Sequence, residues 1–141
     1  MKAHARAYAF GKGEDPEAVK RKLVSANPGS LVQVVRAGGT KNEMLVEMLC
    51  AQTLRAESSG SLLAKRPEID LLLRLAGTTQ IARAIKSHGF ASGEAFLAIN
   101  AGRVEVVVPE GFSAAELPRK KLTKQELGRV EIAALLDAKS A

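Results

Sequence analysis

The stretch from residue 67 to residue 89 constrains the fold most strongly, because it predicts two short helices that meet at a glycine. Pro67 can begin the first helix, since it lacks an N–H group that the first helical turn leaves unpaired in any case. Gly77 is expected to end that helix, and Thr78 or Thr79 can cap the second one. Gly89 stands where a left-handed glycine commonly follows a helix. The apolar positions fall on one face of each helix, at Ile69, Leu72, Leu73 and Ala76 and then at Ile81, Ala84 and Ile85.

Several polar side chains accompany this junction and cannot all point into a core: Arg74, Gln80, Arg83 and Lys86. Together with the free N–H groups at the start of the second helix, they predict a corner that binds anions. Lys65, just before the first helix, is expected to assist it. In the alternative interpretation, Arg74 pairs with Asp70 four residues earlier, and the other cations form a solvated helix face.

The flanking segments predict a sheet covered by further helices. Residues 2–10 alternate alanine with larger side chains, which indicates a strand with one small-residue face, and residues 31–35 form a β-branched run typical of an interior strand. Residues 95–99 and 104–108 are apolar runs around Asn100-Ala-Gly102, and they predict a β-hairpin. The expected order is β-α-β-α-α-α-β-β-α, a single α/β domain over residues 1–141 with a mixed or antiparallel sheet and packed helices.

Capping residues locate the other helices. Asp15 and Pro16 begin one helix, and Thr123 with Glu126 forms a capping box at the start of the last one. Gly38-Gly-Thr-Lys41 also precedes a helix, but Thr comes before Lys and no earlier glycine has the spacing of a phosphate-binding P-loop. We therefore expect Thr40 to cap this helix, with Glu43 closing a second capping box.

The composition is that of a globular protein, and the net charge favours an acidic partner. The chain has 141 residues, of which 46% are hydrophobic, and a net charge of +6. Such a charge favours association with nucleic acid, although one Tyr, four Phe and no Trp leave few rings for base stacking. The N-terminus lacks the apolar segment of a signal peptide, and no apolar run approaches the ~20 residues that cross a bilayer. We expect a cytoplasmic protein without membrane contact.

The residues that would carry catalysis are missing. Cys50 stands alone in the sequence, and His4 and His88 are far apart, so we expect no metal site. Cys50 is interpreted as a small buried hydrophobe, and His88 as a residue that complements a helix C-terminus. No nucleophile elbow or dinucleotide fingerprint is present. The sequence therefore predicts a binding protein with no catalytic residues and no cofactor.

The last helix has apolar residues on more than one side. Leu127, Val130 and Ala134 follow one face, and another face carries Ile132, Leu135 and Leu136. A helix of this kind has apolar surface left for a partner, and we place a protein interface on Ile132, Leu135 and Leu136.

The segment Glu-Ile-Asp-Leu-Leu-Leu-Arg-Leu-Ala-Gly-Thr-Thr-Gln-Ile-Ala-Arg-Ala-Ile, followed by Gly89, resembles the signature of the small KEOPS complex subunit that binds the complex's atypical kinase, in its archaeal form. A weaker resemblance extends from about Leu31 to the C-terminal Glu-Ile-Ala-Ala-Leu-Leu-Asp. The chain departs from relatives at Asn42-Glu43, where they often carry a histidine, and in its alanine-rich first strand.

This resemblance implies a non-catalytic accessory subunit that docks on the KEOPS kinase/ATPase subunit and helps present tRNA for threonylcarbamoyladenosine modification. Archaeal members are associated with the 3′ CCA end of tRNA. On this interpretation the tRNA-binding residues are Lys65, Arg74, Gln80, Arg83 and Lys86, and the kinase interface is Ile132, Leu135 and Leu136. The alternative is a small phosphate- or nucleotide-binding enzyme that uses the Gly38–Lys41 loop and the Gly77 corner.

Overall fold

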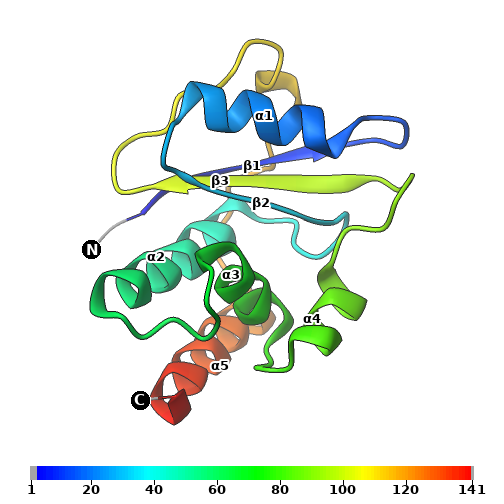
Figure 1. The fold of residues 1–141 in the computed structure, drawn as a ribbon. Helices are drawn as coiled ribbons and strands as arrows, with labels where there is room; N and C mark the ends of the chain where they lie inside the picture. The colour runs from blue at the N-terminus through cyan, green and yellow to red at the C-terminus, as the bar shows by residue number, and fades with distance from the viewer. Residues whose placement is uncertain (1–2, 141) are drawn as a thin grey trace.

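The computed structural model describes residues 3–140, with side chains up to residue 138. Its centre is a three-stranded antiparallel sheet in the order β1-β3-β2 (Figure 1). The strands are β1 (His4–Phe10), β2 (Leu31–Arg36) and β3 (Phe96–Gly102). Ala98 of the central strand lies opposite Tyr8 on one side and Val34 on the other. The predicted α/β class with an antiparallel sheet is confirmed.

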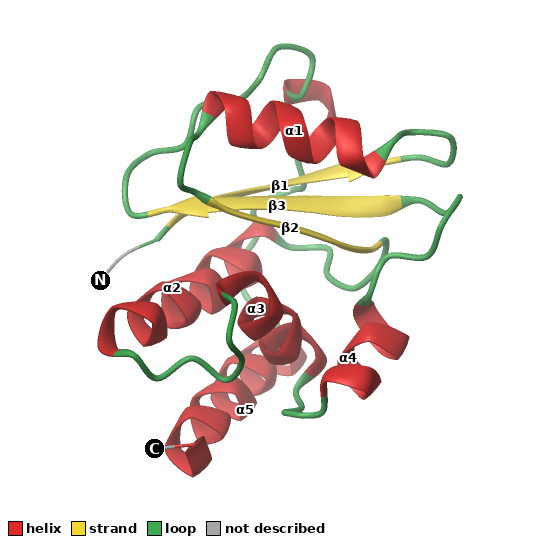
Figure 2. Cartoon of the chain, viewed as in Figure 1, coloured by secondary structure: helices red, strands yellow, loops and turns green. Residues whose placement is uncertain are grey.

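Helices cover both faces of the sheet (Figure 2). One face carries α1 (Pro16–Ala26), and a short 3₁₀ helix, η1 (Ser113–Ala115), lies beside β1. The other face carries α2 (Glu43–Ser59), α3 (Pro67–Ala76), α4 (Ile81–His88) and α5 (Lys124–Ser140). No helix among residues 3–140 is long and apolar enough to cross a membrane.

The alternation of side chains along the strands builds two cores. Ala5 and Ala7 of β1 point toward α2, together with Val35 and Ile99 of the other strands, and join a large apolar cluster with α2, α3 and α5. Tyr8, Phe96 and Ala98 point the other way, onto Val19 and Leu23 of α1 and onto Phe112. The alanines leave room for α2 to pack closely on β1, as the predicted small-residue face requires.

The predicted β-hairpin is wrong, because β3 continues through Asn100 and Gly102 and the described residues 103–108 form no strand. Asn100 is buried within the strand, opposite Arg6 and Val32. Its Nδ2 donates to Ser30 Oγ at 2.7 Å and to Leu31 O at 3.1 Å, and its Oδ1 accepts from Asn27 Nδ2 at 3.0 Å. Distant partners thus satisfy a polar side chain that resembles a turn residue in the sequence.

Three predicted helix caps differ from the structure. The N-cap of α2 is Asn42, whose Oδ1 accepts from Met44 N at 3.0 Å, while Thr40 Oγ1 accepts from the backbone of Asn42. Glu43 closes no capping box, since its buried carboxylate accepts from Ala7 N on the edge of β1 at 3.3 Å. Burial raises the pKa of Glu43, and this hydrogen bond and the guanidinium of Arg6 oppose that effect.

At the α3–α4 junction, Gly77 is left-handed with φ of 71°, as predicted. Neither threonine is the N-cap of α4. That position is Gln80, whose N–H donates to Thr78 Oγ1 at 3.1 Å. Gly89 is extended and not left-handed, with φ of −67°, because the chain leaves α4 to form a bridge with Val35 of β2. The capping box of Thr123 and Glu126 at α5 is confirmed.

Replacement of Asn100 by alanine is expected to lower the free energy of unfolding by about 2–3 kcal/mol, because its buried partners lose their hydrogen bonds. Urea unfolding followed by circular dichroism measures this. Gln125→Ala removes an exposed amide and is expected to change stability by no more than about 0.5 kcal/mol. Equal effects of the two substitutions would contradict the role assigned to Asn100.

Candidate nucleic-acid interface

Arg74 lies inside the molecule, with 0% of its surface exposed. Its Nε and Nη2 donate to Asp70 at 2.6 and 3.1 Å, and Nη1 and Nη2 both donate to Asp137 at 2.7 Å. The placement of Arg74 among the tRNA-binding residues therefore needs correction, because its guanidinium is enclosed by two carboxylates and not presented to solvent. The alternative pairing with Asp70 is the one observed.

The carboxylate of Asp70 also holds two segments outside α3. Thr53 Oγ1 of α2 donates to it at 2.5 Å, and Leu63 N donates to it at 2.9 Å. Burial lowers the pKa of Arg74, but the hydrogen bonds that it donates to Asp137 and Asp70 outweigh burial and leave its pKa above the usual range. We therefore interpret this network as structural: it joins α2, α3 and α5 through one permanent cation.

The other predicted tRNA-binding residues are exposed but do not all come together. Gln80 is the N-cap of α4, and Arg83 and Lys86 lie on the solvent side of that helix. Lys65 precedes the N-terminus of α3, whose ten residues span about 15 Å, whereas the Gly77 corner follows its C-terminus. The structure thus separates Lys65 from the corner.

A second group of cations surrounds a pocket of about 430 Å³ between the loops that precede α2 and α5. Lys41 lines it from the first loop, Lys120 and Lys121 from the second, and Arg129 from α5. Glu126 also lines the pocket, but its carboxylate accepts from Thr123 N at 3.0 Å and from Asn42 Nδ2 at 3.3 Å. The backbone hydrogen bond from Thr123 is the main reason that the pKa of Glu126 is lowered. The pocket is therefore strongly positive.

Arg129 connects this pocket with the Gly77 corner and with the end of α4. Its guanidinium occupies the space that a Cβ atom at Gly77 would need, so a side chain there would displace it. Burial lowers the pKa of His88, and the charges of Arg129 and Arg36 lower it further, which places both guanidinium groups near the imidazole. We call Arg36, Lys41, His88, Lys120, Lys121 and Arg129 the Arg129 cluster. Within residues 3–138 none of its members forms an ion pair.

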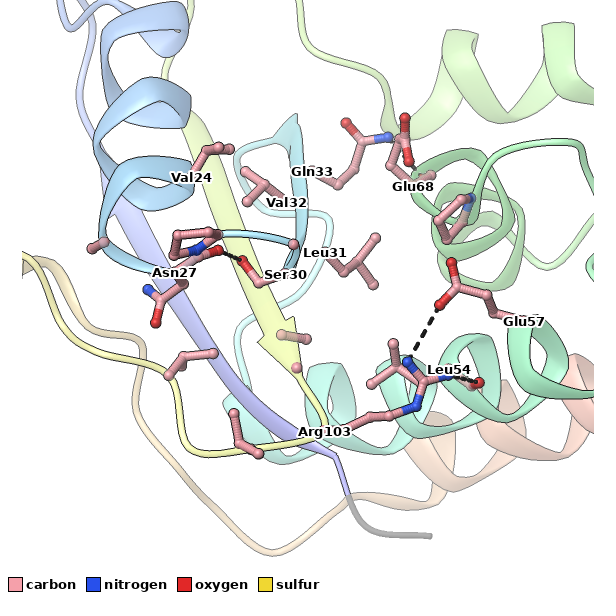
Figure 3. A pocket seen from close by; sticks show the side chains of 18 of the residues that line it. Val24, Asn27, Ser30, Leu31, Val32, Gln33, Leu54, Glu57, Glu68 and Arg103 are labelled. Carbon is pink, nitrogen blue, oxygen red and sulfur yellow. Dashed lines mark hydrogen bonds and ion pairs between the residues drawn. The ribbon is translucent and has the colours of Figure 1, made fainter.

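A larger pocket, of about 640 Å³, lies between the end of α1, the free edge of β2 and the start of α3 (Figure 3). Its cations are already paired. Arg103 approaches Glu57 to 3.6 Å and donates to Leu54 O at 3.0 Å, and Lys20 and Arg66 pair with Glu17 and Glu68. This pocket offers no unneutralised positive charge to an anion, so the Arg129 cluster is the better candidate interface.

Sequence reasoning missed most of the Arg129 cluster. Lys120 and Lys121 are adjacent in the sequence and indicate a basic loop, but Arg36 and Arg129 are isolated cations at the end of a strand and within a helix. No short-range pattern connects them. The fold brings them together through antiparallel pairing of β2 and packing of α5 against α3.

The predicted partner surface of α5 is exposed. Ile132 and Leu135 are 41% and 62% exposed, and Leu136 is half-buried, while Ala133 is enclosed. Ile132 also lies beside Gly77, and α4, which follows that glycine in the chain, exposes Ile81 and Ile85. Apolar side chains of both helices therefore reach solvent near the α3–α4 corner.

Cys50 and Thr40 are both buried. Cys50 is buried, and burial followed by the charge of Glu47 raises the pKa of its thiol. Thr40 of the Gly38–Lys41 loop is buried, with its hydroxyl at the backbone of Asn42. Among the residues that the structure describes, no group of three His, Cys, Asp or Glu side chains could hold a metal ion.

Comparison of the sequence with models of known protein families and with curated proteins found no match.

Arg74→Ala is expected to lower the free energy of unfolding by about 3–5 kcal/mol, because it leaves the buried carboxylate of Asp70 without its counter-ion. Arg83→Ala removes an exposed arginine and is expected to change it by no more than about 0.5 kcal/mol. Urea unfolding of both variants measures the difference. A folded Arg74→Ala protein of unchanged stability would mean that the network contributes little and would return Arg74 to the list of candidate ligand-binding residues.

Proposed function

We propose that this chain is a non-catalytic, cytoplasmic accessory subunit of a KEOPS-like complex, which binds tRNA through the Arg129 cluster and the kinase/ATPase subunit through α5. The resemblance of residues 68–89 to the kinase-binding subunit suggests the complex. The observation that carries the proposed RNA contact is the gathering, around His88 of α4, of cations from β2, α5 and two loops that form no ion pair within residues 3–138. Such a surface can neutralise successive phosphates of a nucleic acid.

The proposed tRNA site differs from the sequence-based one. Arg83, Lys86 and Gln80 remain candidate contacts because α4 joins the Gly77 corner to His88. Arg74 becomes an indirect contributor, since it holds α5 in place. The aromatic side chains in the described residues pack mainly against one another in the smaller core, so the RNA contact is proposed to depend on cations and on hydrogen bonds to base edges. The 3′ CCA end is the proposed single-stranded element.

The same pocket supports a second candidate, a small phosphate- or nucleotide-binding enzyme. A volume of about 430 Å³ falls within the range of small-ligand sites, and Gly39, Thr40 and Lys41 line it. A thermal-shift screen with nucleotides, beside a filter-binding assay with tRNA, separates the candidates. Stabilisation by nucleotides with no retention of tRNA would favour the enzyme.

Lys120→Gln with Lys121→Gln is expected to weaken tRNA binding and to make the slope of log K against log salt less steep by about 1.4, because each phosphate contact on a single strand contributes about 0.7. Filter binding across a salt series measures the slope. The matched control is Arg21→Gln with Lys22→Gln, which removes the same charge from exposed positions on α1, across the sheet from the cluster.

Removal of the 3′ CCA from the tRNA is expected to reduce the affinity of the wild type and of the α1 control, and to have a smaller effect on the Lys120/Lys121 variant. If CCA removal lowered the tRNA affinity of both double variants equally, the cluster would be a nonspecific basic surface. Equal affinity for intact and truncated tRNA would exclude the 3′ end from the site.

Leu135→Arg is expected to abolish co-purification with the KEOPS kinase/ATPase subunit of the same organism and to leave the thermal melt unchanged, because its side chain is mostly exposed. Val104→Arg places the same charge at an exposed valine in the loop after β3 and serves as the control. Retention of the kinase by the Leu135 variant at wild-type level would refute the proposed interface on α5.

A further inference from the structure

Arg36, His88 and Arg129 converge from three separate elements. Arg36 ends β2, His88 ends α4, and Arg129 projects from α5 toward the Gly77 corner. Arg36 Nη1 lies 3.5 Å from the carbonyl oxygen of Ser87, to which it donates, and this contact places the guanidinium beside the last turn of α4. The charges of Arg36 and Arg129 both act on the imidazole of His88.

The imidazole of His88 has one nitrogen engaged and one free. Nδ1 lies 2.8 Å from Ser87 Oγ, whereas Nε2 has no hydrogen-bond partner among the described side chains. A Cβ atom at Gly39 would lie 3.3 Å from His88 Cδ2, so the glycine lets the loop backbone approach the ring. The ring is half-buried and oriented by its neighbours.

The charges that act on the imidazole of His88 are both positive. Arg36 from β2 and Arg129 from α5 face it, the adjoining loop contributes the uncharged Gly39, and no carboxylate is among the charges that act on it. Burial and these two guanidinium groups keep its pKa below the usual range. Lys86 on the same helix is exposed. The free protein therefore holds His88 neutral at neutral pH, beside Arg36 and Arg129, which form no ion pair with the described side chains.

We propose that Arg36, His88 and Arg129 form a phosphate subsite of the RNA-binding surface, and that His88 takes up one proton when a phosphodiester occupies it. This inference rests on the proposed function and adds a specific seat for one phosphate. An anion held by the two guanidinium groups offsets the positive field at the ring and can accept a hydrogen bond from the protonated Nε2. Because the anion raises the pKa of His88, binding takes up one proton from solvent at pH values between the free-state and the bound-state pKa.

The coupling between RNA binding and protonation of His88 has a defined sign. Binding raises the pKa of His88, so RNA affinity is higher at low pH and falls as the pH rises from the free-state to the bound-state pKa. Between those values one proton is taken up, and affinity falls by up to about tenfold per pH unit. Below the free-state pKa and above the bound-state pKa, this histidine contributes no pH dependence.

The test is an NMR pH titration of the histidine ring signals in the full chain, alone, with inorganic sulfate and with a ribo-oligonucleotide that ends in CCA. Sulfate is used because, like a phosphodiester, it keeps its charge across this pH range. We expect both anions to raise the titration midpoint of His88, with the signals of His4 as an internal reference. His88→Gln is expected to remove the fall in RNA affinity with pH, and Arg21→Gln to retain it.

An unchanged His88 midpoint at saturating RNA and sulfate would overturn the subsite, even if RNA still binds elsewhere on the surface. A raised midpoint with sulfate and no RNA binding at any pH would support the subsite and refute the proposed function. If His88→Gln does not fold, the wild-type titrations still decide. An unaltered pH dependence in a folded His88→Gln protein would also overturn the proposal.

Discussion

The pairing of Arg74 with the carboxylates of Asp70 and Asp137 is the interaction on which the packing of α2, α3 and α5 depends. Asp70 and Arg74 lie on α3, Thr53 reaches the network from α2, and Asp137 reaches it from α5. A buried guanidinium must have its donors satisfied, so these helices can pack in few other arrangements without a large cost. The apolar core supplies most of the driving force, and the network selects one packing of α5.

The position of α5 in turn determines the candidate interface. Asp137 anchors its C-terminal half, and Asn42 reaches its first turn through Glu126. Between these anchors lie Arg129 and Ile132, one beside the basic pocket and both beside Gly77. The Arg74–Asp137 ion pair therefore helps to position Arg129, proposed to contact RNA, and Ile132, proposed to contact the kinase. Neither residue takes part in the ion pair. An altered Arg74 can impair both contacts without touching either partner.

Local patterns predicted the parts of the fold that depend on short range. The α/β class, the alanine face of β1, the left-handed Gly77 and the capping box of α5 follow from periodicity and from the backbone preferences of single residues. The errors occurred where a distant partner replaced a local one. The residues next to Asn100 in the sequence give no sign of its hydrogen bonds with the Asn27–Leu31 segment, so the local pattern predicts a turn. Asn42 replaces Thr40 as the N-cap of α2, and its side-chain amide also donates to the carbonyl oxygen of Lys120.

The sequence by itself determined the inventory: an α/β domain with a mixed or antiparallel sheet, a helix pair at Gly77, an excess of positive charge and a last helix with surplus apolar residues. Tertiary structure alone decided which cations are available. Arg74 is buried because Asp137, 63 residues later, completes its hydrogen bonds, whereas Arg129 pairs with no carboxylate of the described residues and lies near His88. Periodicity specifies the face of a helix that a residue occupies. Whether that face meets a carboxylate, another cation or solvent depends on packing between segments far apart in the chain.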